Sequence, residues 1–190
     1  RRSTSEKARL IAFLLKGLLG NTLVTKHSGP RLGFAGTVVD PVEVLVRIAE
    51  RFKYIARELQ TRYGDRATLS LEDEHDAQDL FRALLKLFFE DVRKEDPAPN
   101  VGGGSSRIDF VLPDHAIAVE LKQGRESLSA RELGEQLMVD IERYKKHPNV
   151  RRLVCLVFDE DGHIENPRGI ERDLSRVQDD IAVTVRIVDR

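Results

Sequence analysis

The chain has 190 residues, enough for one globular domain with an added lobe. Hydrophobic residues make up 41% of it and charged residues 33%, which is typical of a soluble folded protein and excludes an intrinsically disordered one. The single cysteine excludes an intrachain disulfide and a zinc site built from several thiolates. No apolar run is long enough to cross a bilayer, so we expect a cytoplasmic protein with no membrane partner.

The net charge of −1 hides an uneven distribution of charge along the chain. Residues 1–70 carry 13 Lys and Arg against 6 Asp and Glu, whereas residues 71–120 carry 5 against 12. An acidic middle between more basic flanks is consistent with a metal site within a surface that binds a polyanion. Solvated faces of alternating sign would give the same distribution, so charge alone leaves both interpretations open.

Residues 1–70 predict an N-terminal helical lobe. Ser3 to Glu6 form a capping box before an apolar helical stretch that ends at Gly20. Asp40 and Pro41 then supply the N-cap and first-turn proline of a second helix, which continues to about Tyr63. These residues carry no recognisable chemistry. We expect the lobe to serve homodimerisation or docking to a partner protein.

The middle of the chain predicts a helix followed by a β-hairpin. The apolar spacing indicates a helix over residues 73–92, and the proline and glycine runs of residues 97–104 indicate a loop. Two alternating stretches, 107–112 and 117–122, flank a four-residue turn that contains Asp114.

The last third of the chain alternates helices and strands. The patterns predict a helix from Ser129 to about His147, a buried strand over 151–158, a short helix over 166–177 and a final strand over 182–188. Cys155, within the apolar strand, is expected to be a small core residue. This order predicts an α/β fold with a mixed central sheet flanked by helices.

The hydrophobic pattern of the hairpin selects one strand register. With a turn over residues 113–116, the pairs on one face are all apolar: Leu112 with Ile117, Phe110 with Val119 and Ile108 with Leu121. The other face pairs Asp109 with Glu120 and Arg107 with Lys122. A slip of one residue would mix the two sets, so we expect this register to form.

Like charges directly opposed across two strands are destabilising. Two carboxylates at that spacing can instead share a divalent cation, which converts their repulsion into coordination. Oxygen ligands favour Mg²⁺ or Mn²⁺ over zinc. Lys122, on the same side as Glu120, could orient an attacking water and stabilise negative charge developing on a phosphate.

The arrangement Asp109…Glu120-Leu121-Lys122 resembles that of the PD-(D/E)XK nuclease superfamily. The resemblance covers residues 73–160 and implies a restriction-endonuclease-like αβββαβ core over residues 71–190. It implies that Asp109, Glu120 and the Leu121 carbonyl bind Mg²⁺ or Mn²⁺ and that Lys122 assists the hydrolytic water. The implied activity is hydrolysis of phosphodiester bonds, with DNA as the expected substrate. The implied context is bacterial defence, as a restriction enzyme or immune effector nuclease, with DNA repair or recombination as the second choice.

Two neighbouring helices carry further candidates that the resemblance suggests. Many members of the superfamily place a metal-associated acid on the helix before the hairpin. Glu74 is our candidate because Gln78 continues its face toward the sheet, although capping of the helix would also explain an acid there. On the later helix, Gln136, Asp140 and Tyr144 form a polar stripe, and Gln136 is our candidate for the catalytic site, although a solvated helix face would explain the stripe equally well.

Phosphate contacts would come from Arg107, Arg125, Arg143 and Lys145, each of which could also be an ordinary surface cation. The competing hypothesis is a catalytically inactive nucleic-acid-binding or scaffolding module with the same fold. Retention of both acids and the lysine favours the nuclease.

Overall fold

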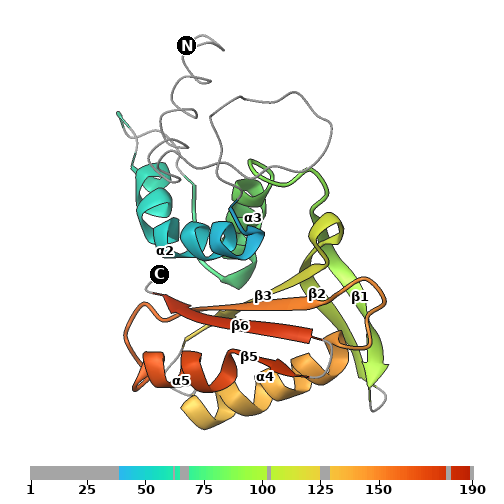
Figure 1. Ribbon diagram of the computed structural model, residues 1–190. Helices are drawn as coiled ribbons and strands as arrows, with labels where there is room; N and C mark the ends of the chain where they lie inside the picture. Colours follow the sequence, from blue (N-terminus) through green and yellow to red (C-terminus); the bar gives the residue numbers. More distant parts are fainter. Residues whose placement is uncertain are drawn as a thin grey trace.

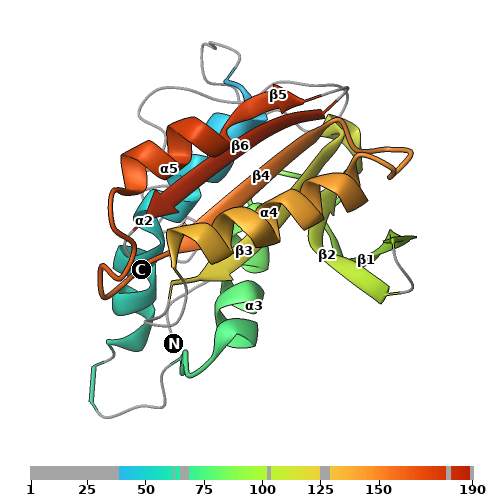
Figure 2. The same cartoon turned by 90° about the horizontal axis from the view of Figure 1, so that it is seen from below.

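The computed structural model describes residues 39–61, 63–64, 69–101, 104–124, 129–178 and 181–188. In this part of the chain, helices cover both faces of a six-stranded sheet (Figure 1). One face carries α2 (Pro41–Gln60) and α3 (Glu74–Leu85). The other carries α4 (Ala130–Tyr144) and α5 (Pro167–Leu174), which lie in front of the sheet in Figure 2. The helix predicted over the first 20 residues lies outside the described residues.

The sheet is mixed, as predicted. Its strands are β1 (Arg93–Val101), β2 (Gly104–Leu112), β3 (Ile117–Gln123), β4 (Arg152–Phe158), β5 (Arg176–Gln178) and β6 (Ile181–Val188). They lie in the order β1-β2-β3-β4-β6-β5. The three central strands β3, β4 and β6 are parallel, and the pairs toward each edge are antiparallel. The α/β fold class predicted from the sequence is therefore confirmed.

Helix α2 begins as the sequence predicted and packs on the sheet. The Asp40 side chain accepts a hydrogen bond from the Val42 amide at 3.0 Å, and Pro41 occupies the first turn. Phe52 is fully buried, with its ring centroid 5.0 Å from that of Phe158 on β4. The predicted division of the chain at residue 70 falls between α2 and α3, which share one hydrophobic core with the sheet. The apolar face of α2 is thus buried within this core.

Two sequence predictions around β1 are wrong. The helix predicted to reach Val92 ends at Leu85, and β1 begins at Arg93. The loop predicted from residue 97 is part of the β1–β2 pairing, in which Pro97 lies opposite Arg107. Proline cannot donate to a ladder, but β1 is an edge strand of the sheet and tolerates it. Local proline and glycine content therefore concealed the edge strand.

The end of α5 also differs from the prediction. The helix predicted over residues 166–177 ends at Leu174, and β5 follows. The Ser175 hydroxyl bonds to both the amide and the carbonyl of Val185, at 2.9 and 3.3 Å, which ties the chain to β6. A tertiary contact thus ends the helix. Among the described residues, no helix has the length and apolar character needed to span a membrane.

Candidate active site

The predicted hairpin register is confirmed next to the turn. In the described β2–β3 ladder, Leu112 pairs with Ile117, Val111 with Ala118 and Phe110 with Val119. The turn itself is a 3-10 turn over Pro113–His115, which keeps Asp114 at the far end of the hairpin from Glu120.

The β2–β3 backbone pairing ends at Phe110 and Val119. Farther from the turn, a side chain of β2 takes the place of the backbone hydrogen bonds. The Leu121 amide donates a hydrogen bond at 2.8 Å to Oδ2 of Asp109. The predicted pair of Ile108 with Leu121 is wrong, because Ile108 packs in the core on the α4 side and Leu121 in the core on the α2 and α3 side. Asp109 thus lies in the gap between β2 and β3 and is bonded to β3 through its carboxylate.

Asp109 is held from a second direction by helix α3. The buried Gln78 amide donates to Oδ1 of Asp109 at 3.1 Å. Burial raises the pKa of Asp109 to about 6, with a further contribution from the negative charge of Glu74 and in spite of the hydrogen bond from Leu121. Negative charge at this position is therefore only partly compensated by the protein.

Glu120 is held from the opposite face, by helix α4. The Tyr144 hydroxyl donates to Oε2 of Glu120 at 2.8 Å, and Nζ of Lys122 lies 3.4 Å from Oε1. Burial and, to a smaller extent, the charge of Asp109 raise the pKa of Glu120 to about 7. The two acids have hydrogen-bond partners on opposite faces of the sheet, yet the charge of Asp109 acts on Glu120 across the gap between the strands.

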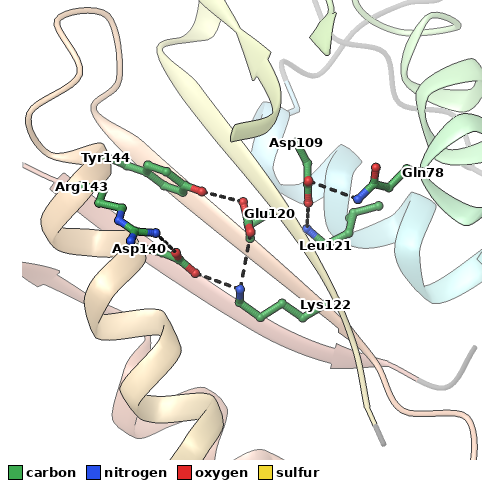
Figure 3. Close-up of polar contacts among 8 residues, drawn as sticks. All are labelled: Gln78, Asp109, Glu120, Leu121, Lys122, Asp140, Arg143 and Tyr144. Carbon is green, nitrogen blue, oxygen red and sulfur yellow. Dashed lines mark hydrogen bonds and ion pairs between the residues drawn. The ribbon is translucent and has the colours of Figure 1, made fainter. Parts of the chain in front are cut away.

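Lys122 completes the cluster with a close ion pair to α4. Its Nζ lies beside Oδ2 of Asp140 (Figure 3), at a distance of 2.8 Å. The two side chains are only 15% and 10% exposed. Burial alone would lower the pKa of Lys122, but the charges of Glu120 and Asp140 outweigh it and raise the pKa above its ordinary value. The ammonium therefore stays protonated at neutral pH.

The donor set suits a hard divalent cation that retains water. In the described part of the chain, no group of three or more His, Cys, Asp or Glu side chains is arranged to hold a metal ion. Glu74 is exposed, and it lines a small hollow together with Leu121 and Lys122. Mg²⁺ commonly takes only one or two carboxylates and completes its shell with waters and substrate phosphates. Asp109 and Glu120, both carrying undercompensated charge, fit that mode of binding.

The other residues predicted for the site are the helix residue Gln136 and the candidate phosphate contacts. Gln136 is exposed on α4, one turn before Asp140, and it is Asp140 that contacts Lys122. Arg143 is half-buried, 4.0 Å from Asp140. Among the other predicted phosphate contacts, Arg107 is exposed and Lys145 forms a 2.6 Å ion pair with Glu142. Arg125 lies outside the described residues.

The sequence patterns gave no site role to Gln78, Asp140 and Tyr144. Asp140 and Tyr144 stand in a polar stripe with four-residue spacing, which indicates that they share one face of a helix. The spacing does not indicate which turn of that helix lies next to the strand. For Gln78 the sequence indicated only a polar residue on the helix face that points toward the sheet. A buried polar residue on an apolar helix face is the signal that would have identified it, because such a residue needs a partner.

A comparison with protein-family models decides the classification. The model of the DpnII-MboI restriction endonuclease family matches residues 43–190. The chain belongs to this family. No curated protein and no solved structure matches it.

The DpnII-MboI family is of the PD-(D/E)XK type, so the resemblance drawn from Asp109, Glu120 and Lys122 is confirmed at the level of the superfamily. The matched range runs from the first turn of α2 to the end of the chain and contains the whole cluster around Glu120. The fold is accordingly restriction-endonuclease-like. Membership supports a DNA endonuclease.

Proposed function

We propose that the chain is a Mg²⁺-dependent endonuclease, active also with Mn²⁺, that hydrolyses phosphodiester bonds in DNA. The observation that carries the proposal is the clustering of two partly buried acids, Asp109 and Glu120, with a partly buried lysine in a chain of a restriction endonuclease family. Partly buried carboxylates that repel each other are costly to a fold, and groups with strongly shifted pKa values cluster at functional sites. Family membership and charge clustering thus support the same chemistry.

Asp109, Glu120 and the Leu121 carbonyl are the groups that would hold the metal. Bound Mg²⁺ supplies Lewis-acid polarisation of a phosphate oxygen and lowers the pKa of a coordinated water. The protein's part is to orient both carboxylates, through the Gln78, Leu121 and Tyr144 hydrogen bonds. Glu74, which lines the small hollow beside Leu121 and Lys122, would contribute through a metal-bound water.

Lys122 would act as a fixed positive charge. Its ammonium has only donors and is held protonated by Glu120 and Asp140. We therefore assign it the orientation of the attacking water and the stabilisation of charge on the phosphoryl oxygens, rather than proton abstraction. Phosphate positioning by Arg107, Arg125, Arg143 and Lys145 is part of the same proposal, and such contacts carry no sequence information.

Family membership also supports a role in bacterial defence, in the cytoplasm where foreign DNA is met, as a restriction enzyme or immune effector nuclease. Homodimerisation or docking through the N-terminal residues remains a prediction, because residues 1–38 lie outside the described part.

The deciding experiment is cleavage of plasmid and linear DNA with Mg²⁺, Mn²⁺ or EDTA. We expect cutting with either metal and none with EDTA. Glu120→Gln and Lys122→Met should abolish it, while Glu135→Gln, at an exposed α4 position paired with Arg131, should cut normally. Tight DNA binding without cutting under both metals would instead identify the inactive binding or scaffolding module.

A further inference from the structure

Helix α4 contacts both motif residues of β3 from two successive turns. Tyr144 bonds to Glu120, and Asp140 pairs with Lys122 (Figure 3). Four residues of helix rise about 6 Å, and two residues of strand rise about 6.6 Å, so the two pairs of side chains match in spacing. The helix therefore holds the two motif side chains as a unit.

The ammonium of Lys122 lies closer to Asp140 than to Glu120. Its Nζ lies 2.8 Å from Asp140 but 3.4 Å from Glu120. Asp140 is itself 7% exposed, and a buried carboxylate persists only when it is paired. Lysine has four rotatable side-chain bonds, so an unrestrained Lys122 would lose its position beside Glu120.

We infer that Asp140 is a positioning residue, which holds the Lys122 ammonium beside Glu120 before DNA arrives. This inference rests on the proposed function, because it gives Asp140 a part in that hydrolysis. Asp140 acts only through Lys122. Its loss should therefore slow the chemical step without weakening DNA binding, since a misplaced catalytic group lowers the rate rather than the affinity.

The first test compares Asp140→Asn, Asp140→Glu and the control Glu135→Gln in single-turnover cleavage with Mg²⁺. Asp140→Asn keeps the shape but removes the charge, and we expect its rate to fall roughly 10- to 100-fold. Asp140→Glu restores the charge and should recover part of that rate. The Kd for the same DNA, measured with Ca²⁺ in place of Mg²⁺, should be unchanged in all variants.

The second test is a double-mutant cycle on thermal unfolding of the metal-free protein. Asp140→Asn should lower the melting temperature when Lys122 is present, because the buried ammonium loses its nearest acid. In a Lys122→Met background the same change should cost much less. Should Asp140→Asn alone fail to fold, the double variant should fold, because the unpaired ammonium is gone.

The outcomes separate this inference from the proposed function. A folded Asp140→Asn variant with an unchanged cleavage rate overturns the inference and leaves the nuclease standing, as does weaker DNA binding at an unchanged rate. If the native chain cuts no DNA, the proposed function fails, and the unfolding cycle alone then decides. Additive changes in that cycle would show that Asp140 does not hold Lys122.

Discussion

The Tyr144 hydroxyl on α4 donates a 2.8 Å hydrogen bond to Glu120 on β3. The tyrosine is fully buried. Burial and the charge of Glu120 both raise the pKa of the phenol, so it remains a donor throughout the physiological range. This bond orients one acid of the proposed metal-binding pair by means of a residue 24 positions away in the chain.

Tyr144→Phe should keep the buried ring and lose only this bond. We expect the free energy of unfolding to fall by about 1.5 kcal/mol, as for a hydrogen bond to a charged or partly charged group. Urea unfolding in EDTA measures it. Cleavage should slow as Glu120 loses its orientation. A variant that matches the native chain in both stability and rate would contradict the proposed orientation of Glu120.

Stability of the metal-free protein should depend on pH through Asp109 and Glu120. Folding raises their pKa values from 3.8 and 4.5 to about 6 and about 7, so between these limits the folded chain holds more protons than the unfolded chain. The free energy of unfolding attributable to these groups therefore falls as the pH rises from about 4 to about 7. Thermal melts in EDTA across this range would measure it.

The matched control for that pH dependence is the double variant Asp109→Asn, Glu120→Gln, in which the slope should be smaller. Adding Mg²⁺ to the native chain at pH 7.5 should raise its melting temperature, because a ligand that binds only the folded state stabilises it. A steeper slope in the double variant would show that other groups dominate.

Glu120→Gln should leave the metal-free protein as stable at pH 8 as the native chain, or more stable. The amide oxygen can still accept from Tyr144, while repulsion with the Asp109 charge is removed. Melting temperatures in EDTA test this, with Glu135→Gln as the control. A large loss of stability would mean that Glu120 is retained for structure rather than for metal binding.

Phe81→Ala should be strongly destabilising. Phe81 on α3 is fully buried, with ring centroids 6.0, 6.2 and 6.3 Å from those of Phe52, Phe110 and Phe158 respectively. Removing a buried aromatic ring costs about 3 to 5 kcal/mol, measurable by urea unfolding. The same helix carries Gln78, so Asp109 should lose its orientation as well. A cost below about 1 kcal/mol would indicate that α3 is loosely packed.

Much of the hairpin could be predicted because its pattern is local. Alternation of apolar and polar residues selects the register of Phe110 with Val119, and a slip would bury the wrong face. The same pattern could not show where β2 leaves β3, because the Asp109 carboxylate takes the Leu121 amide there. The sequence pattern predicts Asp109 and Glu120 as a directly opposed pair. In the structure their hydrogen-bond partners come from opposite faces of the sheet, Gln78 on α3 for Asp109 and Tyr144 on α4 for Glu120.

The sequence by itself determined the register of the β2–β3 hairpin near its turn, the strands β4 and β6, and the N-caps of α2, α4 and α5, because turn chemistry and hydrophobic period depend on neighbours along the chain. It also identified Asp109, Glu120 and Lys122 as the candidate motif. Only the tertiary structure decided that Asp140 rather than Gln136 reaches Lys122, that Gln78 supports Asp109, and that a proline-bearing segment forms an edge strand. Those outcomes depend on how α3 and α4 pack against the sheet. Packing joins residues far apart in the chain, and no local pattern records it.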